Sequence, residues 1–127
     1  MTAHPRIGWL LTGLACLFLL MDAAMKLVPL QVVLDTMDGL GWQGAGPARL
    51  LGAILLAATL LALWPRSALL GHLLLTAYLG GAVAAQLRIG APLGSHVFFG
   101  IYLGLVLWTG LLLRRPALRA MMTGETP

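Results

Sequence analysis

The sequence predicts an all-α fold: an integral membrane four-helix bundle with a short interfacial helix between its first two spans. Hydrophobic residues make up 60% of the 127 residues and charged residues 9%, against about 25% charged residues in soluble domains. A soluble domain of this size cannot bury so much apolar surface, because small domains leave much of their surface in water. The composition therefore excludes a soluble enzyme, a disordered chain and a disulfide-stapled secreted module, and it indicates a single membrane domain over residues 1–127.

The first part of the chain predicts one span followed by a helix that lies along the membrane surface. An apolar stretch covers residues 7–27, close to the roughly 20 residues that cross a bilayer. Its basic start resembles a signal peptide, but an acid stands where cleavage needs a small residue, so we expect an uncleaved helix. Residues 30–40 then carry polar side chains at helical spacing among apolar neighbours, which predicts an interfacial helix. These polar side chains are Gln31, Asp35 and Asp38.

Three further spans are expected in the rest of the chain. The second covers residues 48–64, where a Trp-Pro-Arg sequence places an aromatic ring and a cation at the membrane interface. The third covers residues 66–87 and follows at once, so these two helices form a tight antiparallel hairpin. The fourth covers residues 95–113, after a turn or a short re-entrant piece, and it ends at two arginines and a proline.

Positive charge predicts the orientation of the chain in the membrane. The formal net charge is +4, but most basic residues stand singly between apolar runs, which is typical of membrane orientation and not of nucleic acid binding. Five Lys or Arg residues are expected on one side of the membrane and three on the other, which favours a cytoplasmic location for both termini. The five are Arg6, Arg66, Arg114, Arg115 and Arg119, and the three are Lys26, Arg49 and Arg88.

Polar side chains near the spans concentrate at the outer end of the predicted bundle. Asp22 lies about 7–8 Å inside the end of its span, and a carboxylate at that depth needs a cation as partner. Lys26, Arg49 and Arg88 are available for this role. Two interpretations stay open: the charges pair to seal the end of the bundle, or they line a small polar pocket that opens outward. The candidate pocket residues are Asp22, Lys26, Arg49, Gln86, Arg88 and His96.

His72 is a separate candidate near the inner side of the third span. It lies about 9 Å deep and shares a helix stripe with Thr76. An interhelical hydrogen bond would satisfy its ring, and a proton relay or a ligand contact is the alternative. No metal site is expected, because His72 and His96 lie near opposite membrane faces. The single cysteine, Cys16, can form neither an internal disulfide nor a Cys-x-x-Cys pair.

Small residues on the third and fourth spans predict close helix packing. A G-x-x-x-G pair opens the fourth span, and the third span repeats the same spacing twice. Such spacing lets two helix backbones approach closely, so we expect a tight contact between these helices or a homo-oligomer formed through them. The residues are Gly100 and Gly104, Gly80 with Ala84, and Gly81 with Ala85.

Three pieces of the sequence together resemble the DoxX-like family of small four-helix membrane proteins. They are the Asp22-x-x-x-Lys26-Leu27 end of the first span, the start of the second span at 48–52, and the stretch from 77 to 96 with its continuation to 119. The resemblance implies a four-helix bundle in a bacterial inner membrane. Where the family pattern commonly has a histidine, this chain has Gln86, so any proton or redox chemistry of that histidine is open to question here.

The resemblance leaves three hypotheses of function, since some members are subunits of thiosulfate:quinone oxidoreduction or membrane partners of thiol and superoxide defence enzymes. The first is a non-catalytic subunit, or a bundle that binds a small ligand such as a quinone or a lipid, supporting a redox partner. The second is an oxidoreductase or other enzyme at the extracytoplasmic mouth, with Asp22 and His96 as proton carriers and Arg49 or Arg88 as an anion anchor. The third is a small proton-coupled transporter. No tightly held cofactor is predicted.

Overall fold

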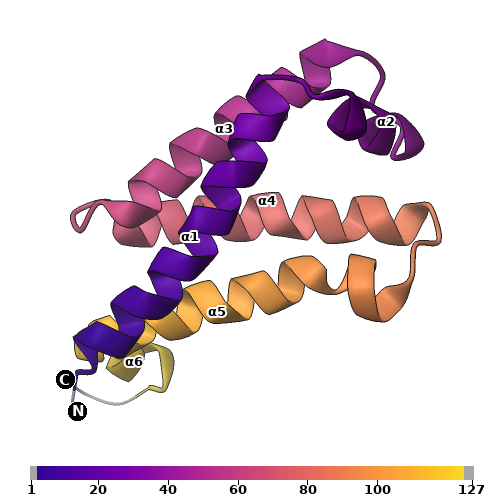
Figure 1. Cartoon of the computed structure of the whole chain (residues 1–127). Helices are drawn as coiled ribbons and strands as arrows, with labels where there is room; N and C mark the ends of the chain where they lie inside the picture. The colour runs from indigo at the N-terminus through magenta and orange to yellow at the C-terminus, as the bar shows by residue number, and fades with distance from the viewer. Residues whose placement is uncertain (1–2, 125–127) are drawn as a thin grey trace.

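The structure is a computed structural model that describes residues 3–124, and it is built from helices joined by short connections (Figure 1). Four helical segments are long and apolar enough to cross a membrane. The predicted all-α fold, with four spans and a short helix after the first, is therefore confirmed. The elements are α1 (Pro5–Leu27), α2 (Gln31–Gly39), α3 (Ala45–Leu63), α4 (Ala68–Arg88), the π-helical turn η1 (Leu93–Val97), α5 (Phe99–Arg114) and α6 (Pro116–Met122).

Proline and glycine set the ends of these helices. Pro5 and Pro116 stand in the first turns of α1 and α6, where the missing N–H group breaks no helical hydrogen bond. Trp64 precedes Pro65 and adopts the extended conformation that ends α3. Gly90 follows α4 with a φ of 71°, a left-handed conformation that glycine adopts without a steric penalty. The connection between α3 and α4 covers residues 64–67 and is longer than predicted, because α4 begins at Ala68 instead of residue 66.

Several boundaries differ from the predicted ones. α1 begins at Pro5 instead of residue 7, and α3 begins at Ala45 instead of residue 48. The fourth span starts as the η1 turn, and Phe98 separates this turn from α5. The prediction that the last helix ends at the arginines was incomplete. The short helix α6 begins directly afterwards, because Pro116 is suited to a first helical position.

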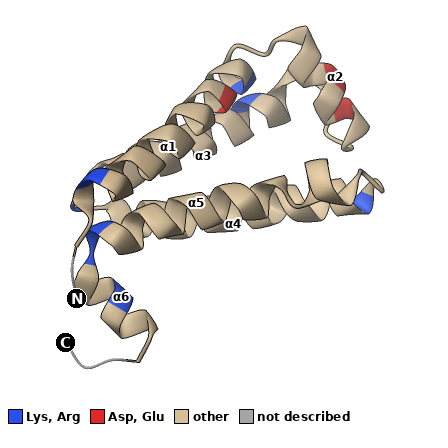
Figure 2. Cartoon of the chain, turned by 60° about the horizontal axis from the view of Figure 1, so that its bottom comes forward, with Lys and Arg blue, Asp and Glu red and all other residues tan. Residues whose placement is uncertain are grey.

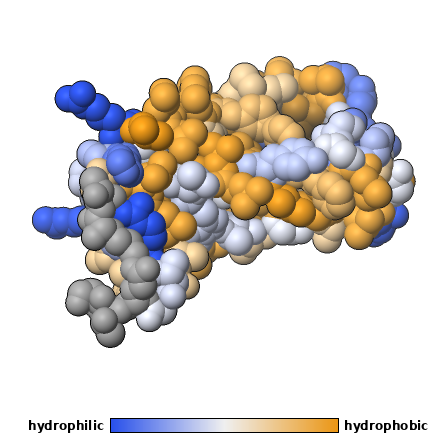
Figure 3. All heavy atoms as spheres, turned by 90° about the horizontal axis from the view of Figure 1, so that it is seen from below, coloured by the Kyte–Doolittle hydropathy of each residue, from blue (hydrophilic) through white to orange (hydrophobic). Residues whose placement is uncertain are grey.

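The four long helices form a ring in which each packs against two neighbours. Both α1 and α4 pack against α3 and α5, so α1 and α4 are partners across the diagonal of the bundle. Figure 3 shows a broad hydrophobic surface between more hydrophilic ends, as expected for a chain in a bilayer. The interior is built from buried aliphatic side chains, among them Ala15, Leu19, Leu55, Ala58, Leu75 and Leu107.

Glycine allows close approach of helices at defined contacts. A Cβ atom on Gly71 would overlap the backbone of Ala62 in the α3–α4 hairpin. A Cβ atom on Gly100 would lie 3.0 Å from the carbonyl oxygen of Leu79, so the predicted close contact of the third and fourth spans is present there. A Cβ atom on Gly80 would have no heavy atom of the described chain within 4 Å, and this part of the small-residue pattern plays no part in packing within the chain.

The two helix pairs diverge toward the end of the bundle that carries α2. In Figures 1 and 2, α1 with α3 and α4 with α5 approach one another near the chain termini and separate toward α2 and η1. Both ends of the described chain lie at the closed end, where the backbone N–H of His4 donates to the carbonyl of Leu113 at 2.8 Å. At the open end, α2 buries its Met37 side chain.

Candidate functional site

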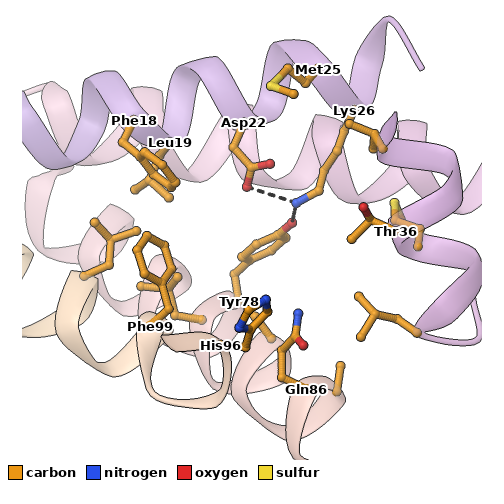
Figure 4. Close-up of a pocket in the computed structure, with 18 of the residues that line it drawn as sticks. Phe18, Leu19, Asp22, Met25, Lys26, Thr36, Tyr78, Gln86, His96 and Phe99 are labelled. Carbon is orange, nitrogen blue, oxygen red and sulfur yellow. Dashed lines mark hydrogen bonds and ion pairs between the residues drawn. The ribbon is translucent and has the colours of Figure 1, made fainter. Parts of the chain in front are cut away.

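A cavity of about 310 Å³ lies at the open end of the bundle, between α1, α2, α4 and α5 (Figure 4). This volume is within the range of about 300–1,000 Å³ typical of small-molecule sites. Most of its walls are apolar or aromatic, including Phe18, Leu19, Val33, Met37, Leu79, Phe99 and Leu103. Its polar lining residues are Asp22, Lys26, Thr36, Tyr78, Gln86 and His96.

Lys26 is the centre of the polar part of the cavity. Its ammonium donates to the Asp22 carboxylate at 3.0 Å and to the Tyr78 hydroxyl oxygen at 2.7 Å. The Lys26 side chain is 16% exposed and the Asp22 side chain 32% exposed, so the cation is the more deeply buried partner. An ammonium in a span needs a counter-charge, and Asp22 supplies it from one helical turn earlier.

The bond between Lys26 and Tyr78 bridges the two diagonal helices, α1 and α4. Figure 4 shows the tyrosine reaching across the cavity to the ammonium. Because these helices do not pack closely against each other, the two long side chains span the space between them. We call this hydrogen-bonded pair the Lys26–Tyr78 bridge.

The bridge presents N–H and O–H groups that have no hydrogen-bond acceptor within residues 3–124. A lysine ammonium has three N–H groups, and Lys26 uses one on Asp22 and one on Tyr78. Tyr78 accepts the lysine bond, so its own O–H proton is available for donation. The charges of Lys26 and Asp22 cancel, and the site therefore offers donors without net positive charge. An uncharged acceptor oxygen, such as a carbonyl, matches these donors.

The six predicted pocket residues divide into two groups. Arg49 is exposed at the start of α3 and does not line the cavity. Arg88 is also exposed, and its guanidinium lies beside the α2–α3 connection, with Nη2 3.4 Å from the position of a Cβ atom on Gly41. The cation that pairs with the Asp22 carboxylate is thus Lys26 and not an arginine. The cavity is lined by the other four, Asp22, Lys26, Gln86 and His96.

Gln86 and His96 lie on the side of the cavity opposite α1 (Figure 4). Gln86 is on the last turn of α4. His96 is on η1, and its Nδ1 atom is 2.8 Å from the hydroxyl oxygen of Ser95. A histidine therefore does reach this cavity, but it comes from the π-helical turn and not from position 86.

Tyr78 was not predicted from the sequence as a site residue, and neither was the aromatic pair of Phe18 and Phe99. The two phenylalanine rings have centroids 5.3 Å apart at 58° and line the cavity beside its polar part. The available signal for Tyr78 was a phenol in an apolar helix, because a buried tyrosine hydroxyl usually finds a hydrogen-bond partner. Its partner is 52 residues away, and only the fold brings the two together.

His72 lies outside the cavity, in a separate buried cluster. The residue is 1% exposed, and its Nδ1 donates to the carbonyl of Ala68 at 2.7 Å. Its Nε2 atom has no hydrogen-bond partner within the described chain. The His72 ring meets the Trp108 ring edge-on with centroids 5.8 Å apart, and the Trp108 indole N–H donates to Thr76 at 2.8 Å. The predicted interhelical hydrogen bond to the His72 ring is therefore wrong, because the ring bonds within its own helix. The interhelical bond in this cluster joins Trp108 to Thr76 instead.

Residues 3–124 contain no group of three or more His, Cys, Asp and Glu side chains placed to hold a metal ion. The single cysteine, Cys16, is 1% exposed in the core of the bundle. The polar groups that the chain itself brings to the cavity are thus hydrogen-bonding and proton-carrying side chains.

Comparison with known proteins assigns the chain to a family. No curated protein and no solved structure matches the chain. A family model described as the DoxX-like family matches residues 10–110, a range that includes every residue lining the cavity. The chain therefore belongs to the DoxX-like family, as its sequence motifs predicted.

Proposed function

We propose that the chain is a non-catalytic membrane subunit that binds a small neutral amphipathic molecule of the quinone class in the cavity. The observation that carries this proposal is the Lys26–Tyr78 bridge, with its unused donors in a mostly apolar cavity. The carbonyl oxygen of a quinone is an uncharged hydrogen-bond acceptor, and the quinone ring requires apolar walls. Apolar walls with a few placed polar groups are the usual form of a small-molecule site.

The charges around the cavity support a neutral ligand over an anionic one. Asp22 already neutralises Lys26 at 3.0 Å. A phosphate or carboxylate of a ligand at the bridge would be attracted by the Lys26 ammonium but repelled by the Asp22 carboxylate. The two arginines that would attract an anion, Arg49 and Arg88, do not line the cavity. An uncharged carbonyl oxygen can accept a hydrogen bond at the bridge without this repulsion between full charges.

A separate enzyme would supply the electrons in this proposal. The single cysteine gives the chain no dithiol of its own. The family resemblance, in which some members serve thiosulfate:quinone oxidoreduction, supports a role beside such a redox partner. In this role the chain would hold the quinone in the membrane within reach of the partner's redox centre.

The proposed setting is a bacterial inner membrane with both termini in the cytoplasm, which puts the cavity near the extracytoplasmic face. The support is twofold. Both ends of the described chain lie at the closed end of the bundle (Figure 1), and this end carries five of the eight Lys and Arg residues.

A second candidate is an enzyme that acts on the ligand in the same cavity. It is favoured by Asp22 and His96, two proton-carrying groups that both line the cavity. The proton-coupled transporter has less support, because its acid would be expected in the middle of the membrane, whereas Asp22 lies near the end of α1 beside Lys26.

Mass spectrometry of the protein purified from bacterial membranes tests the proposal. Ala85 lines the cavity, so Ala85→Leu should fill part of it, whereas the neighbouring Ala84 is exposed outside the lining and Ala84→Leu is the matched control. We expect a quinone near one per chain in the original protein and the control, and at least a tenfold lower amount in Ala85→Leu. Equal amounts in all three proteins, or no quinone in any, would reject the proposal. Turnover of quinone by the purified chain with a chemical reductant would favour the enzyme instead.

A further inference from the structure

A second cavity lies on the other side of the Lys26–Tyr78 bridge. It has a volume of about 250 Å³, and α1, α3, α4 and the segment from α2 into the α2–α3 connection contribute to its walls. Lys26 and Tyr78 themselves line both cavities, and so do Met37, Leu40 and Ala82. The two cavities therefore adjoin at the bridge.

The second cavity differs from the first in its chemistry. Away from the bridge, its walls are apolar or aromatic, and the Asp22, Gln86 and His96 groups of the first cavity are not among them. The residues that belong to this cavity alone are Trp42, Leu51, Ala77 and Gly81. Such a lining suits a hydrocarbon and offers little to a polar headgroup.

The volumes also indicate that one ligand uses both spaces. The first cavity, at about 310 Å³, is near the lower limit of the range of about 300–1,000 Å³ for small-molecule sites. The second, at about 250 Å³, is below that range on its own. A ring with its carbonyls fits the first cavity, and a tail attached to that ring requires further apolar space.

We propose that the second cavity holds the tail of the ligand whose head is bound in the first cavity, so that the molecule passes beside the Lys26–Tyr78 bridge. The inference rests on the proposed function and adds the class of ligand: a quinone with an isoprenoid tail, not a tailless ring. The tail leaves the bundle between α3 and α4, on the side where Gly81 and Ala77 are exposed. Small side chains at these positions keep that exit open.

Neighbouring glycines on α4 provide a matched test. A Cβ atom would meet no heavy atom of the described chain within 4 Å at either Gly80 or Gly81, but only Gly81 lines the second cavity. Gly81→Leu should therefore fill the tail space, and Gly80→Leu should not. Ala77 lines the same cavity one helical turn earlier on α4. The variant Ala77→Leu is therefore used in place of Gly81→Leu if Gly81→Leu does not fold. Size-exclusion chromatography checks that the variants compared have the same oligomeric state.

The measurement is the ratio of the dissociation constants of two benzoquinones, with one and with three isoprenoid units, in one detergent. Partition of the longer tail into micelles affects every variant equally, so it cancels when the variants are compared. We expect the preference for the longer tail to fall about fivefold in Gly81→Leu, which corresponds to roughly 1 kcal/mol, and to stay within about twofold in Gly80→Leu.

The outcomes separate this inference from the proposed function. In one outcome, Ala85→Leu loses binding of the short-tail quinone, but Gly81→Leu keeps the tail preference of the original protein. This outcome would overturn the proposed tail site and retain the proposed head site. An equal loss of preference in Gly80→Leu would also overturn it, because the effect would not depend on the cavity. Absence of saturable binding for both quinones would reject the proposed function itself.

Discussion

Removal of the Asp22 carboxylate is the perturbation with the clearest expected consequence for stability. In Asp22→Asn, the Lys26 ammonium would remain at 16% exposure with Tyr78 as its hydrogen-bond partner but without a counter-charge. Hydrogen bonds to charged groups contribute about 1.5–3 kcal/mol, and exposed ion pairs about 0–1 kcal/mol. Since Asp22 is 32% exposed, we expect a loss of about 2 kcal/mol, in the lower half of the range for hydrogen bonds to charged groups.

Removal of the cation should have a smaller effect. In Lys26→Met, the remaining carboxylate is one-third exposed and can be solvated at the membrane interface, so we expect a loss of about 1 kcal/mol. The double variant leaves no unpaired charge and should also lose about 1 kcal/mol, less than Asp22→Asn alone. The coupling energy between the two sites would then be about 2 kcal/mol.

The free energy of unfolding can be measured by SDS titration, with the four tryptophans as fluorescent reporters. Asp35 on α2 provides a matched control, because it bonds to Gln31 at the same four-residue separation but is exposed. Asp35→Asn should change the free energy by less than about 0.5 kcal/mol. Additive losses in the double variant, or equal losses for Asp22→Asn and Asp35→Asn, would refute the reasoning.

Three further predictions concern packing and orientation. Gly71→Ala should destabilise the protein by about 3 kcal/mol or more in the same SDS titration, because the new Cβ would overlap the α3 backbone, while Gly80→Ala should stabilise it by up to about 1 kcal/mol. Thr76→Val should lower stability by about 1–2 kcal/mol, since the indole of α5 loses its acceptor; an unchanged value would contradict this. In a cysteine-free background, Gln43→Cys should react with an impermeant thiol reagent outside intact cells and Thr123→Cys should not; the opposite result would reverse the orientation.

The sequence predicted the helical architecture well because the bilayer fixes the length of a span. Apolar runs and the prolines between them located α1, α3, α4 and α5, and the polar stripe located α2. The η1 turn was not predictable in the same way, since contacts outside it help to hold it: the Tyr102 hydroxyl of α5 donates to the carbonyl of Gly94 at 2.9 Å. α6 was missed because it is short and follows a charged break.

The site was only partly predictable, because the sequence gives the depth of a residue in the membrane more readily than the rotation of its helix. Asp22 and Lys26 were found from depth and from their spacing of four residues. Arg49 and Arg88 were predicted at a similar depth, but neither lines the cavity. Tyr78 was missed because its contact with α1 crosses the diagonal of the bundle, a relation that depends on packing and not on periodicity.

The central claim is that the bridge holds the carbonyl of a bound quinone, and titration with a short-tail benzoquinone tests it most directly. Tyr78→Phe keeps the ring and removes the available O–H, while Tyr102→Phe removes a hydroxyl that donates outside the cavity. One hydrogen bond contributes about 1 kcal/mol, so affinity should fall about fivefold in Tyr78→Phe and stay unchanged in Tyr102→Phe. Equal affinity in both variants would contradict the claim.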